Sequence, residues 1–438
     1  MLGTLVLAIL AGHRRYAHVT ALRGDAVAAQ ALGLNRVVSE DALRRALARF
    51  DEASSAKWLL PALLGRVRDA LDRPWVLDID ASIKPLYGRQ TEGAELGYNP
   101  HKPGRPSHVL HTYWVGNLRL VLDVQVSPGK QHSSAHAKAG LTRLLEELGD
   151  RRPALVRGDC GYGNEGILLT LEGLDQRYLL RLRQTKNVQR LIARQFGRMD
   201  WSQADAQGCQ AVEDQLKLDG WSAKRRVVIV RRRIKEGMVR EQRSARGLLR
   251  LAFADAPTLE AFKMWEYTVL VTDVGYALEA VAQLYRDRAD CRKSKERGFD
   301  ELKNQWGLGG FTTQDLARCQ TTARAGALVY NWWSWYCRAA HPGARLEAVT
   351  SRPLLLAAVG KAVNHGGQTQ LYLTPLHAKF DTIRTLVANI RAALQHVKAT
   401  AEQIPKVDRW ATLVRYICQR IVVEIAANPA LKALGASG

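Results

Sequence analysis

The spacing of apolar residues changes several times along the chain, and each change predicts a different kind of element. Through residues 1–72 apolar side chains recur at intervals of three and four, as in Leu43, Leu47 and Phe50, which predicts helices. Two short helical stretches between residues 26 and 50 fit a helix-turn-helix-like DNA-binding unit, and they also fit an ordinary pair of packed helices. We therefore predict a helical N-terminal region and leave both interpretations open.

From residue 73 the pattern becomes that of short strands. Apolar runs bounded by turn residues occupy residues 75–80, 109–115, 118–126, 154–157 and 178–183. Gly116-Asn117, between the second and third runs, is a typical tight-turn pair and predicts a hairpin. A helical pattern at residues 141–148 separates this hairpin from the next strand. Strands and a helix in this order predict a mixed α/β core.

The next region, residues 186–273, is predicted to be a β-rich insertion. Its strand-like runs are residues 224–234, 248–253 and 265–272. The first run is densely basic, and both a phosphate-binding role and the solvated face of an edge strand fit it. Helical spacing then returns, with a long helix predicted at 313–340. The predicted regions are 1–72, 73–185, 186–273, 274–345 and 346–438, the last mostly helical.

The charge balance indicates a polyanionic partner. The 438 residues include 64 Lys and Arg against 42 Asp and Glu, a formal net charge of +22, and 47% of them are hydrophobic. Such a chain can build apolar cores and attracts polyanions, with nucleic acid as the first candidate and an anionic membrane surface as a remote one. Six widely spaced cysteines suit a reducing cytoplasm. No apolar run reaches the ~20 residues of a membrane span.

One charged helical stretch organises the candidate chemistry. At about 100° per residue in an α-helix, four of its polar side chains fall within roughly 80° of one another, namely Tyr285, Arg288, Glu296 and Lys303. Glu301 falls at roughly 160° from Tyr285 on the same count and so points away from this stripe. Glu296 is therefore the acid predicted to serve the site.

Two further acids, Asp80 and Asp159, follow strand-like runs. Carboxylate oxygens suit Mg²⁺ or Mn²⁺, and two such ions about 3.5–4 Å apart support phosphoryl transfer by activating the attacking oxygen and stabilising the leaving one. Taken singly, a strand-end Asp is more often a turn cap, and a helical Glu is more often a salt-bridge partner. Together with Glu296, in a polyanion-binding protein, these acids suggest an enzyme that acts on phosphodiesters.

Six short motifs occur in order between about residues 70 and 370. They are Leu77-Asp78-Ile79-Asp80, Tyr87-Gly88, Gly97-Tyr98-Asn99-Pro100, Arg157-Gly158-Asp159-Cys160-Gly161-Tyr162, Tyr285-Arg286-Asp287-Arg288-Ala289-Asp290-Cys291 and Phe299-Asp300-Glu301-Leu302-Lys303-Asn304. Together they resemble bacterial insertion-sequence transposases of the DDE class, in the branch with a Tyr-Arg-Glu-Lys signature. The resemblance implies a ribonuclease-H-like α/β catalytic core with a β-rich insertion between the second Asp and the Glu.

The resemblance also implies roles for individual residues. The metal-binding triad, for two Mg²⁺ or Mn²⁺ ions, would be Asp80, Asp159 and Glu296. Asp78 is a less favoured substitute for Asp80, because the family acid is followed two positions later by a hydroxyl residue, here Ser82. DNA phosphates near the scissile bond would be contacted by Tyr285, Arg288 and Lys303, since cations neutralise phosphates whatever the base sequence.

The spacing within the signature departs from the family. Seven residues lie between Arg288 and Glu296, which corresponds to a four-residue insertion at roughly 292–295. Four residues rotate a helix by about 40° and lengthen it by about 6 Å. The stripe is kept, but Tyr285 and Arg288 are displaced by about one turn from the acid unless the extra turn loops out.

The sequence thus predicts a transposase that cleaves insertion-sequence ends and transfers the strands into target DNA. The resemblance implies element terminal inverted repeats and target DNA as partners, with a homodimer assembled on DNA. A location in the bacterial cytoplasm, associated with the nucleoid, is expected. Two alternatives remain open: a nuclease of the same fold without strand transfer, and a catalytically inactive DNA-binding relative.

Overall fold

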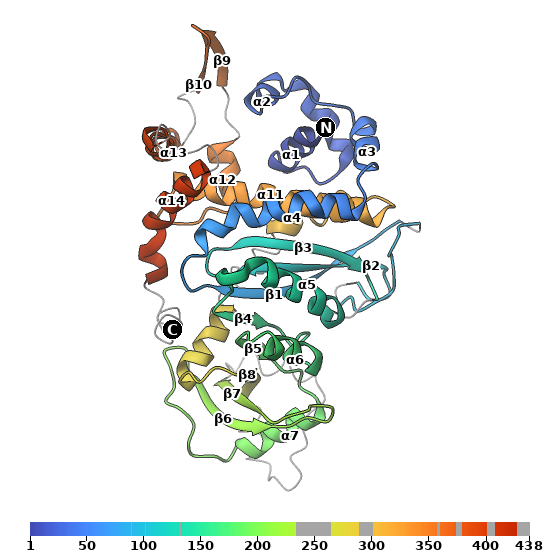
Figure 1. Ribbon diagram of the computed structural model, residues 1–438, viewed down its shortest axis with the longest axis vertical. Coiled ribbons are helices and arrows are strands. Elements are labelled where there is room, and N and C mark those ends of the chain that lie inside the picture. Colours follow the sequence, from blue (N-terminus) through green and yellow to red (C-terminus); the bar gives the residue numbers. More distant parts are fainter. Residues whose placement is uncertain are drawn as a thin grey trace. The chain divides into compact units, whose positions relative to one another are not determined.

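The computed structural model describes residues 1–88, 90–100, 102–130, 133–233, 264–288, 301–356, 360–373, 379–400 and 408–426 (Figure 1). The chain forms two compact units, and each is described by itself. Unit 1 comprises Met1–Arg73, Ala81–Gln131 and Lys293–Asn428, and unit 2 comprises Pro74–Asp80, His132–Arg292 and Pro429–Gly438.

Unit 2 is built on a mixed sheet. Its strands, in sheet order, are β1 (Val76–Pro85, of which residues from Ala81 on belong to unit 1), β4 (Leu155–Gly158), β5 (Tyr178–Arg181), β8 (Trp265–Thr272), β7 (Arg225–Arg233) and β6 (Cys209–Leu216). The pairs β1–β4 and β4–β5 are parallel, and the remaining pairs are antiparallel. Val76–Ile79 of β1 and the whole of β4 are buried, as expected for strands covered on both faces.

The helices of unit 2 are α5 (Ser133–Leu148), α6 (Glu165–Gly173) and α7 (Lys186–Gln195), together with helical residues 278–288. The first two pack against each other. α6 begins where the side chain of Asn164 accepts a hydrogen bond from the backbone N–H of Ile167 at 3.3 Å, an N-cap that satisfies one of the free donors of the first turn.

The strand predicted at 265–272 is confirmed as β8, and the one at 224–234 as β7, whereas 248–253 lies outside the described residues. Four arginines of β7 have partners within unit 2: Arg225 with Glu165 and Glu172, Arg226 with Glu213, Arg232 with Glu266, and Arg231 between the rings of Trp201 and Trp265. Their engagement within the fold favours a structural role for this basic run over phosphate binding.

Unit 1 has a hairpin covered by two helices. β2 (Ser107–Val115) pairs with β3 (Leu120–Pro128), and both α4 (Glu52–Val67) and α11 (Leu316–Ala340) pack against β3 (Figure 1). Two amide side chains of α11 bond to the backbone of β3. Gln320 accepts from Val126 N–H and donates to the Val124 carbonyl, both at 2.6 Å. Asn331 accepts from and donates to the backbone of Val121 at 2.9 and 2.7 Å.

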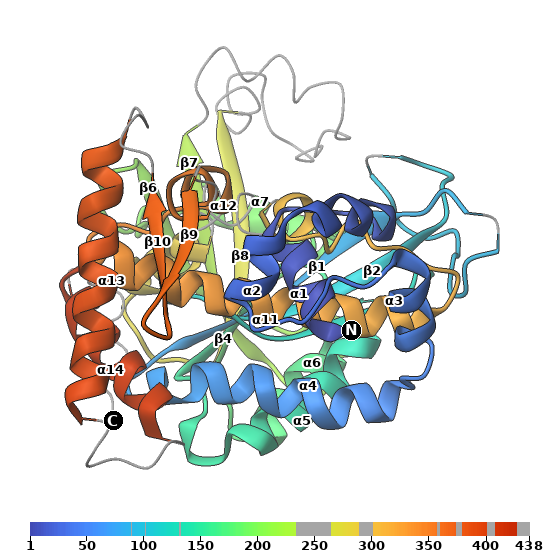
Figure 2. The same cartoon turned by 90° about the horizontal axis from the view of Figure 1, so that it is seen from above.

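The rest of unit 1 is largely helical. Its further elements are α1 (Leu2–Leu10), α2 (Ala26–Ala31), α3 (Glu40–Leu47), a π-helical turn at Glu301–Gln305, α12 (Ala348–Leu355), β9 (Gly360–His365), β10 (Gln368–Leu373), α13 (Phe380–Thr400) and α14 (Asp408–Ala426). α13 and α14 pack side by side (Figure 2). The β9–β10 hairpin interrupts a region that the apolar pattern predicted as mostly helical. Among the described helices, none combines the length and apolarity that crossing a membrane requires.

Candidate active site

Asp80 lies within β1, and Asp159 is the first residue after the neighbouring parallel strand β4. The register pairs Asp78 with Arg157 and Ile79 with Gly158, so the next step along both strands brings Asp80 level with Asp159. Adjacent strands lie about 4.8 Å apart, and side chains two positions apart share a face. Both aspartates therefore emerge on one face of the sheet, and both are only partly buried.

Asp78 lies on the same face but has a different environment. Its carboxylate is completely buried and accepts two parallel hydrogen bonds from Arg157, from Nε and Nη2, each at 2.9 Å. The Arg157 guanidinium also donates to the backbone carbonyl of Leu284, which ties the pair to the helix at residues 278–288. A carboxylate held in this bidentate pair serves the fold, and this favours Asp80 over Asp78 as the functional acid.

Arg288 links these acids. Its Nη2 lies 3.6 Å from an Asp80 carboxylate oxygen and donates to the Ile79 carbonyl at 3.2 Å, and its Nε lies 4.0 Å from Asp78. Burial lowers the pKa of Arg288, but the charges of Asp80, Asp78 and Asp159, together with Tyr285, outweigh burial and raise that pKa above its usual value. The buried Arg288 guanidinium therefore interacts electrostatically with all three carboxylates. The resemblance had assigned Arg288 to DNA phosphates.

The remaining predicted residues are placed as follows. Glu296 and the four-residue insertion lie outside the described residues. Tyr285 packs, partly buried, against the apolar core of unit 2. Lys303 belongs to unit 1, where its Nζ donates to the Ile83 carbonyl at 2.7 Å.

Glu301 is a structural residue of unit 1, in keeping with its exclusion from the predicted stripe. It is 1% exposed, and its Oε2 accepts from Arg345 at 2.7 Å. Its Oε1 accepts from Ala348 N–H at 3.0 Å and from Trp306 Nε1 at 3.2 Å. A carboxylate with all of these donors stabilises the junction between the π-helical turn and α12.

The donor chemistry of the Asp80–Asp159 pair fits a hard divalent cation. Among the described residues no cluster of three His, Cys, Asp or Glu side chains could hold a metal ion. The pair therefore needs a further ligand, for which Glu296 remains the prediction.

The sequence did not predict that Arg157 pairs with Asp78. Its role depends on strand register, and no periodicity within a single run reveals which residue of another strand will lie opposite. The Arg157-Gly158-Asp159 order does carry a signal in retrospect, because an Arg two positions before a strand-end Asp shares its face.

Residues 1–395 match the family described as Transposase DDE domain group 1, so the chain belongs to this family. It is a DNA transposase of the DDE class, an enzyme, and the expected family membership is confirmed. DDE transposases use divalent metal ions. No curated protein matches the chain.

Three solved structures are similar to the chain. The piggyBac transposase synaptic complex with hairpin DNA has 10% identity over 96% of this chain and 74% of its own, with a TM-score of 0.40. The Mos1 transposase paired-end complex with left transposon end has 15% identity over 36% and 56%, with a TM-score of 0.18. The Mos1 mariner paired end complex with Mn has 17% identity over 36% and 56%, with a TM-score of 0.17. These TM-scores are too low to establish a shared fold, and the mixed α/β assignment rests on the strands and helices themselves.

Proposed function

We propose that this transposase cleaves DNA at the ends of an insertion sequence and transfers the freed strands into target DNA, using a ribonuclease-H-like core. The single observation that carries the proposal is the register that brings Asp80 level with Asp159, with the Arg288 guanidinium 3.6 Å from the Asp80 carboxylate. Glu296 completes the proposed set. The three carboxylates would hold two Mg²⁺ or Mn²⁺ ions.

Bound divalent cations would supply activation of the attacking oxygen and charge stabilisation of the leaving oxygen. In the first reaction a water oxygen forms a new bond to phosphorus, the bond between phosphorus and the 3′ oxygen breaks, and that oxygen takes up a proton. In the second, the resulting 3′-hydroxyl oxygen attacks a target phosphodiester in the same way. Asp80 and Asp159 provide fixed negative charge in this scheme, and the Asp78–Arg157 pair holds their strands in register.

The DNA contacts follow the resemblance, with one adjustment. Tyr285 and Lys303 are proposed to contact phosphates near the scissile bond. Arg288 is proposed to pair with Asp80 in the DNA-free protein. When DNA binds, Arg288 is proposed to leave Asp80 and contact a phosphate instead. A homodimer on paired element ends, in the bacterial cytoplasm, completes the proposal, and a nuclease without strand transfer is its alternative.

The test is DNA cleavage with Mg²⁺ on duplexes bearing the element ends, comparing wild type with Asp159→Asn. We expect the variant to lose at least about 10³-fold in rate, because a missing metal ligand removes several kcal/mol of transition-state stabilisation. Asp175→Asn is the matched control. This exposed residue of unit 2 has φ of +50°, a conformation that Asn also tolerates.

Equal cleavage by wild type and Asp159→Asn would refute the assignment of this acid. Cleaved ends that never join a supplied target duplex would favour the nuclease alternative.

A further inference from the structure

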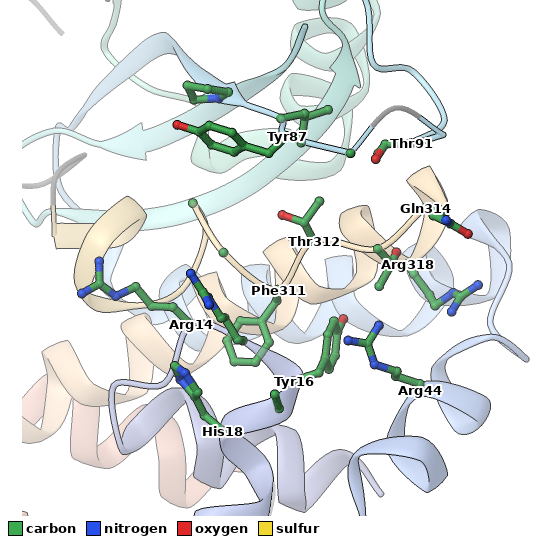
Figure 3. Close-up of a pocket in the computed structure, with 18 of the residues that line it drawn as sticks. Arg14, Tyr16, His18, Arg44, Tyr87, Thr91, Phe311, Thr312, Gln314 and Arg318 are labelled. Carbon is green, nitrogen blue, oxygen red and sulfur yellow. The ribbon is translucent and has the colours of Figure 1, made fainter. Parts of the chain in front are cut away.

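A pocket of about 1210 Å³ lies within unit 1, lined by segments far apart in the sequence (Figure 3). Five of its lining residues carry a full positive charge: Arg14, Arg15, Arg44, Lys303 and Arg318. Among the described residues that line it there is no Asp or Glu. A pocket with this charge selects an anionic ligand.

Backbone contacts fix the pocket wall that carries Arg14. The Arg14 carbonyl accepts a hydrogen bond from Phe311 N–H at 2.6 Å. Gly310 lies so close that a Cβ placed on it would come within 2.1 Å of the same carbonyl oxygen, so only glycine fits there. The Gly310 carbonyl in turn accepts from the buried Lys84 Nζ at 2.6 Å. The bond from Phe311 involves only the backbone of Arg14, and the exposed Arg14 side chain lines the pocket.

Tyr16 packs against the same wall of the pocket. Its hydroxyl forms a hydrogen bond with Thr322 at 2.8 Å, and its ring meets the Phe311 ring edge-on at 5.2 Å. The Arg44 guanidinium lies 4.8 Å from the centre of the Tyr16 ring. Burial raises the pKa of Tyr16 to about 12, so the ring stays neutral at any physiological pH and adds no negative charge to the pocket.

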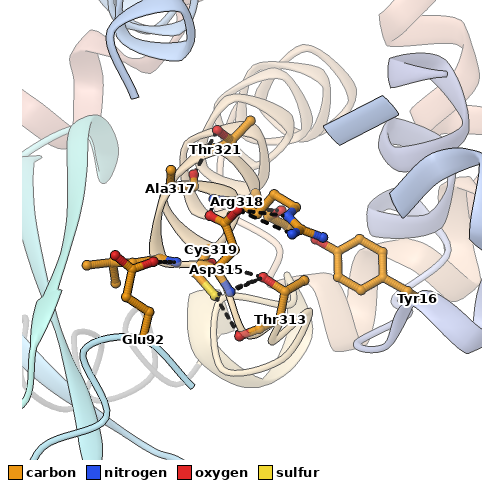
Figure 4. Close-up of polar contacts among 10 residues, drawn as sticks. Tyr16, Glu92, Thr313, Asp315, Ala317, Arg318, Cys319 and Thr321 are labelled. Carbon is orange, nitrogen blue, oxygen red and sulfur yellow. Dashed lines mark hydrogen bonds and ion pairs between the residues drawn. The ribbon is translucent and has the colours of Figure 1, made fainter. Parts of the chain in front are cut away.

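The cations differ in how far their charge is offset. Arg44 pairs with Glu40 at 2.7 Å, and Arg318 pairs with Asp315 at 3.2 Å (Figure 4). Arg14 and Arg15 are exposed, and within the described part of the chain neither forms an ion pair. Two full charges at the pocket therefore lack an internal counter-charge.

The other side of the pocket presents an aromatic ring. Tyr87 is 67% exposed, and Figure 3 shows it across the pocket from Arg14 and His18. The Arg105 guanidinium and the Lys102 ammonium lie 4.5 and 5.0 Å from the centre of its ring. Exposed aromatic rings among cations are typical of surfaces that bind nucleic acid, where the ring contacts a base or sugar and the cations neutralise phosphates.

We propose that this pocket binds a short stretch of the sugar–phosphate backbone of DNA, with Arg14 and Arg15 neutralising consecutive phosphates. The volume exceeds the roughly 300–1,000 Å³ of typical small-molecule sites, and the separated cations suit a chain of phosphates better than a single anion. Lys303, which the resemblance assigned to DNA, lines the same pocket. The inference rests on the proposed function and adds the N-terminal segment around residues 14–18 to the DNA-binding surface.

The test is equilibrium binding of a fluorescent DNA duplex by the full-length chain in EDTA, where no cleavage occurs. For Arg14→Ala/Arg15→Ala we expect affinity to fall by about 10- to 100-fold at 0.1 M salt. We also expect the slope of log K against log salt to become shallower by about 2, whatever the DNA sequence. Arg14→Lys/Arg15→Lys should retain most of the affinity. The control, Arg391→Ala/Lys398→Ala, removes the same charge from exposed positions on α13, outside the pocket.

An affinity and a salt slope equal to those of the control pair would overturn the proposal, and so would displacement of the DNA by millimolar inorganic phosphate, which would mark a small-anion site. Circular dichroism establishes that each variant is folded. Asp159→Asn should bind DNA like wild type. Failure of the pocket proposal thus appears in binding, and failure of the catalytic proposal appears in cleavage alone.

Discussion

The two charged regions of this transposase use arginine in contrasting ways. In unit 2, Arg157 and Arg288 are buried among Asp78, Asp80 and Asp159, and each guanidinium is bonded to carboxylate or carbonyl oxygens. In the unit 1 pocket, Arg14 and Arg15 are exposed and, within the described residues, free of ion pairs. A net charge of +22 does not say where a polyanion binds. The pairing of individual cations distinguishes those that build the fold from those that are available to DNA.

The largest expected effect on stability comes from removing the buried ion pair between Asp78 and Arg157. Asp78→Asn replaces a fully buried carboxylate with an amide that opposes Arg157 with N–H groups, and we expect a loss of about 3 kcal/mol in the free energy of unfolding, as for a broken buried ion pair. Urea unfolding measures this loss. Single-turnover cleavage, corrected for the folded fraction, should stay close to wild type. Unchanged stability with abolished cleavage would instead make Asp78 the metal ligand in place of Asp80.

A smaller effect is expected at Arg225, whose guanidinium bridges Glu165 and Glu172 at 2.6 Å each. Because these carboxylates are partly exposed, Arg225→Met should cost about 2 kcal/mol near pH 7, less than breaking a fully buried pair. Thermal unfolding measures the difference, and Arg232→Met is the control, since its pair with Glu266 is largely exposed.

The cost of Arg225→Met should depend on pH. Hydrogen bonds from Arg225 lower the pKa of Glu172 and, against the opposing effect of burial, also lower that of Glu165. The stabilisation is therefore fully present above the unfolded-state pKa of about 4.3 and is lost as the pH falls through the lower folded-state values. The difference in stability between the two proteins should begin to shrink as the pH falls below about 4. A difference that stays constant from pH 7 to pH 3 would show that packing of the Arg225 side chain, and not its ion pairs, is responsible.

The smallest expected effect is a change in DNA affinity when the ion pair of Arg44, at the exposed pocket, is removed. Glu40→Gln removes the carboxylate that offsets Arg44, so DNA affinity should rise about two- to fivefold, as expected from the 0.2–1 kcal/mol of an exposed ion pair. Binding in EDTA measures the change. Asp408→Asn, at an exposed position of α14, changes the net charge equally and should leave affinity nearly unchanged. An equal rise in both variants would mean that only the overall charge matters.

The sequence predicted the parts of the fold that local patterns determine. The strand at 265–272 was placed correctly because its apolar and β-branched run admits no helical face, and the hairpin was placed by Gly116-Asn117. The first strand was predicted to end near Asp80, because the residues after it lack a continuous apolar run. The structure shows that β1 continues to Pro85. At Lys303, which was predicted to lie on an α-helix, the structure has a π-helical turn, Glu301–Gln305, and side-chain spacing does not predict this kind of turn.

The candidate site was predictable to a different degree. Asp159 follows a strand among glycines, as predicted, whereas Asp80 lies within β1 and not at its end. The Asp78–Arg157 pair depends on register between strands. The pocket was beyond reach, because Arg14, Tyr87 and Arg318 come from three distant segments that only the folded chain assembles. Arg14 and Arg15 are merely a basic doublet in the sequence.

The amide side chains of Gln320 and Asn331 have a consequence for how copies of the protein can associate. They occupy backbone donors and acceptors along the outer edge of β3, where an unprotected strand would recruit a strand from another molecule. A second transposase therefore cannot join at this edge by extending the sheet. Any contact between two copies would have to use another part of the surface.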